Sequence, residues 1–385
     1  MFNFEENEFM SFTSLGLSPD LLKVLSDQHF TLATPIQQAA IPAILNKKDV
    51  FGIAKTGSGK TVSYVLPLLM NLKEAPKLKN RHVNALVLVP TRELAEQVKD
   101  VFKIFNKGLN VPVKAVAVYG GVSINPQMTA LQGTNIVIAT PGRLLELVAS
   151  NAVSLSDIET LVLDEADKML NLGFKEEVDK IISLLPQKRQ NIFFSATLNA
   201  DIQLIHQVIL HDPLVIKIEE QEDSIEQIQQ VAYIVSNENK GPFLRKLICS
   251  REMQQVLIFT SSVHAADAVV NKLRKNNFDA KAIHSKKSQG ARTEALYLFK
   301  SGKLKILVAT DLIGRGIDID RLPFVINYEL PRSPKDYVHR IGRTGRAEQI
   351  GEAISLVSPD ELDHFEVIQK KMGKKVDLIY SENVV

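Results

Sequence analysis

A glycine-rich segment near the start of the chain has the residue types that bind phosphate groups. It reads Ala54-Lys-Thr-Gly-Ser-Gly-Lys60-Thr61, with alanine where the usual phosphate-binding loop has its first glycine. Glycines let such a loop wrap a phosphate, the following helix start supplies N–H donors, the lysine reaches the outer phosphates and the next hydroxyl coordinates Mg²⁺. A plain strand-to-helix turn is the alternative. We predict a nucleotide site made of Ala54, Thr56, Gly57, Ser58, Gly59, Lys60 and Thr61.

Acidic residues follow a later apolar run. Leu161-Val-Leu163 leads directly into Asp164-Glu165-Ala-Asp167. A carboxylate at the end of a buried strand, opposite a phosphate loop, is suited to hold Mg²⁺, usually through water, and an adjacent glutamate can orient or deprotonate the attacking water. The alternative is a solvated helix start. Together with the phosphate loop, the pattern predicts Thr61 and Asp164 at the metal and Glu165 beside the attacking water.

Regular elements must position these motifs, and short runs rich in Val, Ile and Leu are the candidates. The runs do not alternate between apolar and polar residues and are too short for buried helices, which is typical of strands buried on both faces of a parallel sheet. Helix-like stretches such as 93–105 and 174–185 lie between them, and a short amphipathic helix is expected from Ser18-Pro19 onward. The first set of predicted strands is 49–54, 85–89, 113–119, 135–139, 161–163 and 191–194.

A second set of the same kind follows. The length of 385 residues allows two or three domains at about 150 residues each. An acidic stretch, Glu219-Glu-Gln-Glu-Asp223, separates the sets and cannot bury a face. We therefore predict an α/β fold with a first domain at 1–218, a linker at 219–224 and a second domain at 225–385. The second set of predicted strands is 231–235, 255–259, 280–283, 305–308, 324–327 and 353–357.

Composition narrows the class of protein. The net charge is only +2, so any polyanion must be held by positioned groups, and the hydrophobic share of 45% with 23% charged residues is that of ordinary globular domains. The single cysteine, Cys249, excludes an internal disulfide and a cysteine-rich zinc site. No run approaches a membrane span and the acidic start is unlike a secretory signal. We expect a cytoplasmic monomer with no membrane partner.

Several motifs in one order carry a family resemblance that covers nearly the whole chain. Asp-Glu-Ala-Asp at 164–167 occurs with Ser195-Ala-Thr197, Pro90-Thr-Arg-Glu-Leu94, Thr140-Pro-Gly-Arg143 and His339-Arg-Ile-Gly-Arg-Thr-Gly-Arg346. The chain thus resembles a DEAD-box ATP-dependent RNA helicase. The resemblance implies two RecA-like domains, each a mainly parallel sheet flanked by helices, that close on ATP with Mg²⁺ and on single-stranded RNA.

The resemblance also implies roles for individual residues. Phe12 and Gln37 match the adenine-reading element, although His29 and Ala33 stand where the family usually has glycine and proline. Ser195 and Thr197 would bond Asp167 and His339 and so couple hydrolysis to domain closure. The positions that match contacts to the RNA backbone are Arg92, Gly121, Thr140 and Arg143 in the first domain, and Thr260, Gln289, Arg292 and Thr310 in the second.

The last motif adds residues of the second domain to the nucleotide site. Arg343 and Arg346 lie three apart, share a face on a helical turn and could both reach the γ-phosphate. Asp318 would contact the ribose, and Gly314 stands where alanine is commoner. With Lys60, Asp164 and Glu165, the two arginines complete the predicted catalytic set.

Three functions fit these motifs. The first is an RNA-dependent ATPase that separates short RNA duplexes or strips bound protein. The second is a DNA translocase of the same superfamily, which should lack Phe12 and Gln37. The third is a nucleotide-switched RNA clamp that binds without unwinding. The sequence favours the first.

Overall fold

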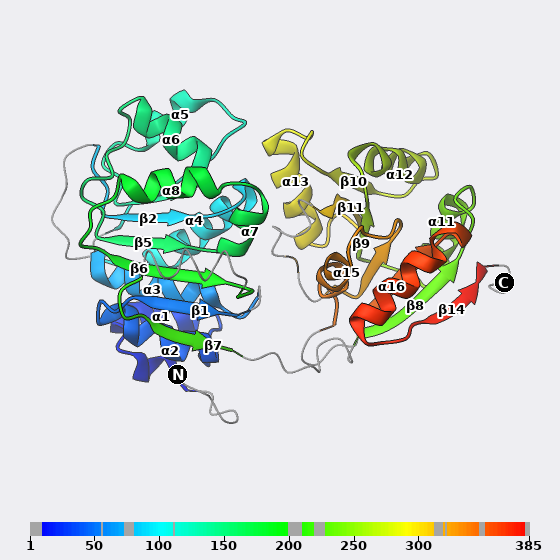
Figure 1. The fold of residues 1–385 in the computed structure, drawn as a ribbon, viewed down its shortest axis with the longest axis horizontal. Coiled ribbons are helices and arrows are strands. Elements are labelled where there is room, and N and C mark those ends of the chain that lie inside the picture. Colours follow the sequence, from blue (N-terminus) through cyan, green and yellow to red (C-terminus); the bar gives the residue numbers. More distant parts are fainter. Residues whose placement is uncertain are drawn as a thin grey trace. The chain divides into compact units, whose positions relative to one another are not determined.

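The computed structural model describes residues 10–54, 57–72, 81–110, 112–198, 210–218, 228–311, 319, 322–345 and 351–381. The chain divides into two compact units, Met1–Glu219 and Glu220–Val385. This division falls inside the predicted linker, which itself lies outside the described residues. Each unit is built around its own sheet (Figure 1).

The first unit contains a parallel sheet. Its seven described strands lie in the order β3-β4-β2-β5-β6-β1-β7. Every pairing is parallel, so the carboxyl ends of the strands share one edge of the sheet. The strands are β1 (Val50–Ile53), β2 (Ala85–Leu88), β3 (Ala115–Val118), β4 (Ile136–Ala139), β5 (Thr160–Leu163), β6 (Gln190–Ser195) and β7 (Leu214–Lys217).

Alternate residues of these strands enter two separate hydrophobic cores. On β1, Val50 faces one core and Phe51 faces the other, because successive side chains of a strand point to opposite faces. One core is closed by η1 (Phe12–Leu15), α1 (Pro19–Asp27), α2 (Pro35–Leu45), α3 (Lys60–Leu72) and α4 (Arg92–Asn106). The other is closed by α5 (Ile124–Ala130), α6 (Pro141–Ala149), α7 (Ala166–Asn171) and α8 (Lys175–Ser183).

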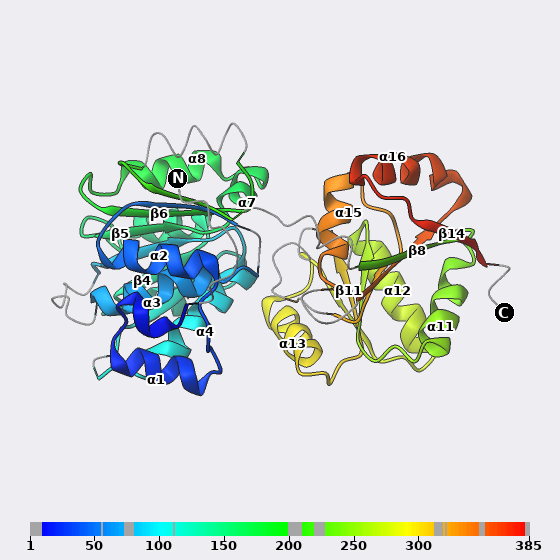
Figure 2. The same cartoon turned by 90° about the horizontal axis from the view of Figure 1, so that it is seen from below.

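The second unit repeats the plan. Its seven described strands are all parallel, in the order β10-β11-β9-β12-β13-β8-β14. Helices cover both faces of the sheet (Figure 2). The strands are β8 (Ile228–Ile234), β9 (Val256–Thr260), β10 (Ala280–Ile283), β11 (Ile306–Thr310), β12 (Phe324–Asn327), β13 (Gly351–Val357) and β14 (Asp377–Tyr380). The helices are α11 (Lys240–Ser250), α12 (Val263–Lys275), α13 (Gln289–Lys300), α15 (Pro334–Ile341), η2 (Pro359–Glu361) and α16 (Leu362–Met372).

Several helices begin at a side-chain cap close behind a strand. Thr91 accepts a hydrogen bond from the amide of Leu94 at the start of α4, and Ser262 does the same for Ala265 at the start of α12. Such caps satisfy backbone donors that the first helical turn leaves unpaired. Short strand-to-helix loops therefore keep the polar residues of the motifs close to the sheet edge.

The predicted α/β class with two flanked parallel sheets is confirmed, but two strands were not predicted. β7 and β14 are the outermost strands on one side of their sheets. Three of the four residues of β14 are exposed, and β7 buries only Ile216 fully. Both segments contain a three-residue apolar run, Leu214-Val-Ile216 and Leu378-Ile-Tyr380, as short as that of β5, so the apolar pattern was present but was not assigned to strands. Within the described part of the chain, no helix is both long and apolar enough to cross a membrane.

Candidate functional site

The phosphate loop connects β1 to α3. Gly57 and Gly59 have φ angles of 84° and 95°, which side chains rarely adopt. The ammonium of Lys60 is buried and donates to the carbonyl of Ala54 at 2.7 Å. The predicted site residue Thr56 lies outside the described residues. The loop thus aims the start of α3 and its lysine at the carboxyl edge of the first sheet, as phosphate binding requires.

Gln37 lies against this loop. Its Nε2 donates to the carbonyl of Gly59 at 3.2 Å, and its Oε1 accepts from the amide of Thr34 at 2.9 Å. The hydroxyl of Thr34 donates to the carbonyl of Ser58 at 2.8 Å. A Cβ at position 59 would lie 2.5 Å from Gln37 Nε2, and the φ of 95° is one that residues with a side chain rarely adopt, so glycine is favoured there. A primary amide has two N–H donors and two acceptor lone pairs, and Gln37 uses one of each in these bonds with described residues.

Phe12 belongs to the hydrophobic core. It opens the 3-10 helix η1, which Ser11 caps, and only 3% of its surface is exposed. It packs in the same cluster as Leu15 and Ile36. Stacking of an adenine on its ring stays a prediction.

Asp164 ends a buried strand beside Lys60. Its amide donates to the carbonyl of Leu88, which continues the pairing of β5 with β2 by one residue. The side chain is 2% exposed, and Oδ2 accepts from the hydroxyl of Tyr64 at 2.9 Å. Burial raises the pKa of Asp164 to about 6, and the positive charge of Lys60 opposes that rise. A cation placed here would favour the ionised carboxylate.

Glu165 has an unusual backbone. Its φ of 54° and ψ of 47° lie in the left-handed region, which is uncommon for residues other than glycine. Its side chain is buried, and Oε1 accepts from the ammonium of Lys168 at 2.7 Å. Held at the start of α7, this carboxylate is fixed next to Asp164.

Thr197 connects the end of β6 to the acidic segment. Its hydroxyl donates to Oδ2 of Asp167 at 3.1 Å. Ser195, the last residue of β6, instead donates from its hydroxyl to the carbonyl of Thr197 at 2.7 Å. A hydrogen-bonded turn thus joins two loops of the sheet edge, and the predicted bonds of these residues to His339 stay predictions.

Three loops of the first unit bring positive charge together. A Cβ at Gly121, whose φ is 76°, would lie 2.2 Å from Nη1 of Arg92. Arg143 donates from Nη2 to the carbonyl of Val122 at 2.9 Å, and its buried Nη1 has no acceptor among the described residues. Burial and the charge of Arg143 lower the pKa of Arg92. Thr140 is buried at the N-cap of α6. We name Arg92, Gly121 and Arg143 the arginine cluster.

In the second unit, the predicted residues lie on adjacent elements. Thr260 and Thr310 are paired in register at the ends of β9 and β11. On α13, the guanidinium of Arg292 donates to Oε1 of Gln289 at 2.9 Å. His339 lies half-buried on α15, and Arg343 is 5% exposed just beyond that helix. The predicted residues Asp318 and Arg346 lie outside the described residues.

Arg340 anchors this motif, and the sequence had not singled it out. Its guanidinium donates to both carboxylate oxygens of Asp311, at 2.5 and 2.8 Å, and to Oδ1 of Asn327 at 3.0 Å. It also lies over the ring of Phe259, 5.1 Å from the centroid. A paired, buried guanidinium of this kind fixes α15 against the ends of β11 and β12. An arginine within a helix gives no sequence signal that distinguishes it from a solvated one.

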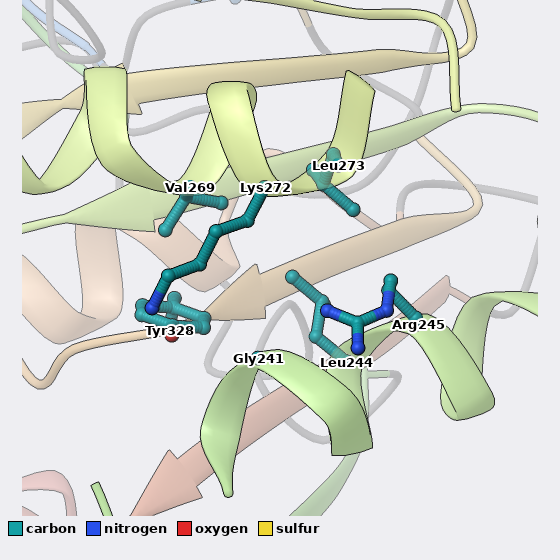
Figure 3. A pocket seen from close by; sticks show the side chains of 7 residues that line it. All are labelled: Gly241, Leu244, Arg245, Val269, Lys272, Leu273 and Tyr328. Atoms are coloured by element: carbon teal, nitrogen blue, oxygen red, sulfur yellow. The ribbon is translucent and has the colours of Figure 1, made fainter. Parts of the chain in front are cut away.

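The pocket shown in Figure 3 lies elsewhere, between α11 and α12 of the second unit. Leu244, Val269 and Leu273 form its apolar part, and Arg245 and Lys272 extend along it. None of the predicted site residues lines it. The phosphate loop, Asp164, Ser195, Thr260 and Thr310 lie at or just after the carboxyl ends of strands, where open parallel sheets bind their ligands. Phe12 and Gln37 lie instead on η1 and α2.

Comparisons with known proteins agree with this geometry. A family model described as "DEAD/DEAH box helicase" matches residues 34–205, and one described as "Helicase conserved C-terminal domain" matches residues 239–348. The DEAD-box ATP-dependent RNA helicase CshA of Streptococcus pneumoniae is 40% identical over 95% of this chain and 69% of its own length. CshA of Bacillus subtilis is 36% identical over 96% and 74%.

Solved structures show the same resemblance. Dbp5 of S. cerevisiae bound to RNA and ADP BeF3 aligns with a TM-score of 0.83 at 28% identity, covering 97% of this chain and 96% of that one. A DEAD box protein from Methanococcus jannaschii aligns with a TM-score of 0.53 at 36% identity, over 97% and 100%. The chain belongs to the DEAD-box family of ATP-dependent RNA helicases, enzymes that hydrolyse ATP. The family expected from the sequence motifs is confirmed.

Proposed function

We propose that this chain hydrolyses ATP in response to RNA and uses the closure of its two domains to open short RNA duplexes or displace bound proteins. One observation carries the proposal. The phosphate loop, the buried acid pair Asp164 and Glu165, and the arginine cluster all follow strands of one parallel sheet, at its carboxyl edge. A nucleotide and a polyanion can therefore bind along the same edge.

The nucleotide end of this edge fits Mg²⁺ with ATP. Mg²⁺ prefers hard oxygen ligands and usually takes one or two from the protein and the rest from phosphates and water. The hydroxyl of Thr61 and the carboxylate of Asp164 are such donors. When bound, the ion would neutralise charge that develops on the transferred phosphoryl group. Lys60 holds the outer phosphates, and Glu165 orients or deprotonates the attacking water. Gln37 reads the adenine edge with its amide, together with Phe12.

The arginine cluster supports binding of a nucleic-acid backbone. Arg143 is paired with Glu146 at 2.8 Å, yet its charge still lowers the pKa of Arg92, so the two guanidinium groups repel each other and a phosphate between them would offset that cost. The relatives named as RNA helicases and the Dbp5 structure with RNA support RNA as that ligand. Thr140 belongs to the same surface, and Thr260, Gln289, Arg292 and Thr310 form its counterpart in the second domain. Contacts of this kind position RNA without reading its sequence.

Coupling between the two ligands is assigned to the second domain. Domain closure would bring Arg343 and Arg346 to the γ-phosphate, Asp318 to the ribose and His339 to the turn formed by Ser195, Thr197 and Asp167. Because the domains close on one short segment, only a few neighbouring base pairs would be destabilised. Short duplexes should then open, whereas long ones should resist.

Steady-state ATP turnover tests this function. We expect single-stranded RNA to stimulate hydrolysis strongly, and DNA of the same sequence to stimulate it little, because the 2′-hydroxyl is recognised. Equal stimulation by DNA would favour a translocase of the same superfamily. RNA binding without stimulated turnover would favour a nucleotide-switched clamp. Either result would overturn the proposal.

Gly121→Ala should weaken RNA binding. The new methyl group would displace the guanidinium of Arg92 and disrupt the arginine cluster. Loss of a charge-assisted hydrogen bond costs about 1.5–3 kcal/mol, so we expect at least about a tenfold loss of affinity. Fluorescence anisotropy of a labelled single-stranded RNA, measured with a non-hydrolysable ATP analogue, gives the affinity.

The matched control for this change is Gly133→Ala. Gly133 also has a positive φ, 64°, but a Cβ there would meet nothing within 4 Å. It therefore reproduces the backbone strain without the clash, and it should bind RNA like the parent. If Gly121→Ala bound RNA as tightly as Gly133→Ala, the arginine cluster would not be part of the RNA site.

A further inference from the structure

The hydroxyl of Tyr64 lies in the interior of the first unit and touches the acidic segment. Tyr64 is on α3, one helical turn after Lys60, and it is fully buried. Its hydroxyl donates to Oδ2 of Asp164 at 2.9 Å. Its ring lies 5.9 Å from that of Phe194 on β6. The ring is thus packed as core, whereas the hydroxyl is directed at a residue assigned to the metal site.

The surroundings of Tyr64 keep its hydroxyl protonated. Burial, with the charge of Asp164, raises the pKa of Tyr64 well above its usual value. The hydroxyl is therefore a donor, and its proton is directed at Oδ2 of Asp164.

This hydrogen bond determines how Asp164 presents its oxygens. The O–H of Tyr64 occupies one carboxylate oxygen of Asp164 and leaves the other free of that bond. Phenylalanine would fill the same space in the core but could not donate this bond.

We propose that Tyr64 is a positioning residue for Mg²⁺-bound nucleotide, which orients Asp164 through its hydroxyl. The inference rests on the proposed function, in which Asp164 serves the metal. Tyr64 does not touch the nucleotide. Its effect should therefore appear in the part of nucleotide affinity that Mg²⁺ contributes, and not in the part that the loop contributes alone.

The test is Tyr64→Phe in the full chain. The affinity for a fluorescent N-methylanthraniloyl ADP is measured in Mg²⁺ and again in EDTA, and the ratio of the two gives the gain due to the metal. We expect Tyr64→Phe to reduce this gain about tenfold, the effect of one charge-assisted hydrogen bond, and to change the affinity in EDTA less than twofold. Loss of affinity by the same factor in both conditions would show a purely structural role and overturn the proposal.

Tyr337→Phe is the matched control. Tyr337 is also fully buried, and its hydroxyl is bonded to Ser355 at 3.2 Å in the second unit. Removal of that hydroxyl should leave the gain from Mg²⁺ unchanged while imposing a comparable loss of stability. Thermal unfolding of both variants identifies any shared folding defect. A reduced gain in both variants would overturn the assignment to Tyr64.

A double-mutant cycle with Asp164→Asn separates this inference from the function on which it rests. If Asp164→Asn keeps the full gain from Mg²⁺, the proposed metal site itself is wrong. If it loses the gain but Tyr64→Phe alone does not, the site stands and the role of Tyr64 is refuted. We expect both single variants to lose the gain, and Tyr64→Phe to have no further effect when Asn occupies position 164.

Discussion

Glu165→Gln should bind nucleotide normally and hydrolyse it about 10² to 10⁴ times more slowly than the parent, which is the usual contribution of a general base. Glutamine keeps the size of the side chain and can still accept from Lys168, so the left-handed backbone at this position and the start of α7 should persist. Only the capacity to take a proton from water is lost. The measurement is kcat for ATP at saturating RNA, together with the affinity for ADP in Mg²⁺.

The control for this change is Glu176→Gln on the exposed first turn of α8. It makes the same chemical substitution away from the sheet edge, and it should retain the parent rate. If Glu165→Gln also retained a rate within a few-fold of the parent, another group would have to activate the water. Weakened ADP binding in Glu165→Gln would instead indicate a role in holding the nucleotide.

The inner strands and the loops after them could be predicted because they obey simple local rules. A fully buried strand needs a continuous apolar run, and β2 and β5 provide one. A phosphate loop needs glycine where φ is positive, as at Gly57 and Gly59. Since the described strands of each sheet are parallel, the loops after them reach one edge of that sheet, so the sequence pattern alone placed them together.

The contacts between distant side chains could not be predicted from the sequence. By its sequence pattern Tyr64 is an ordinary core aromatic. Only the placement of α3 beside the end of β5 shows that its hydroxyl donates to Asp164. In the sequence Arg340 cannot be distinguished from the other arginines of its basic motif. Its two hydrogen bonds to Asp311 depend on where β11 ends, which the sequence does not show. These contacts arise from the relative placement of elements, which no residue spacing encodes.

Gln37 could be predicted only in part. The family resemblance implies that its amide reads adenine. The resemblance does not imply that the same amide bonds Gly59 and closes a capping box with Thr34, which only the structure gives. One side chain thus ties the start of α2 to the phosphate loop. A nucleotide contact of this amide would therefore act directly on the backbone of the phosphate loop at Gly59.

Arg343→Ala and Arg346→Ala should each reduce RNA-stimulated hydrolysis by about 10³ to 10⁵, the usual effect of losing an arginine finger. The loss should appear in kcat, because the phosphate loop that we propose to bind ATP belongs to the other domain. Arg343 lies immediately after Gly342, and its carbonyl accepts from the amide of Leu322 at 3.0 Å. Its backbone is therefore anchored independently of its guanidinium. Single-turnover hydrolysis with saturating RNA measures the chemical step directly.

Arg343→Lys and Arg332→Ala make this prediction specific. Lysine keeps the charge but loses the planar fork that spans two phosphoryl oxygens, so Arg343→Lys should recover only a small part of the rate. Arg332 is exposed just before α15, and its removal should leave the rate unchanged.

Because Arg343 is buried, thermal unfolding must show that Arg343→Ala remains folded at the assay temperature. A folded Arg343→Ala that hydrolyses ATP within a few-fold of the parent would make this arginine structural, and the same result for Arg346→Ala would remove both fingers from the mechanism.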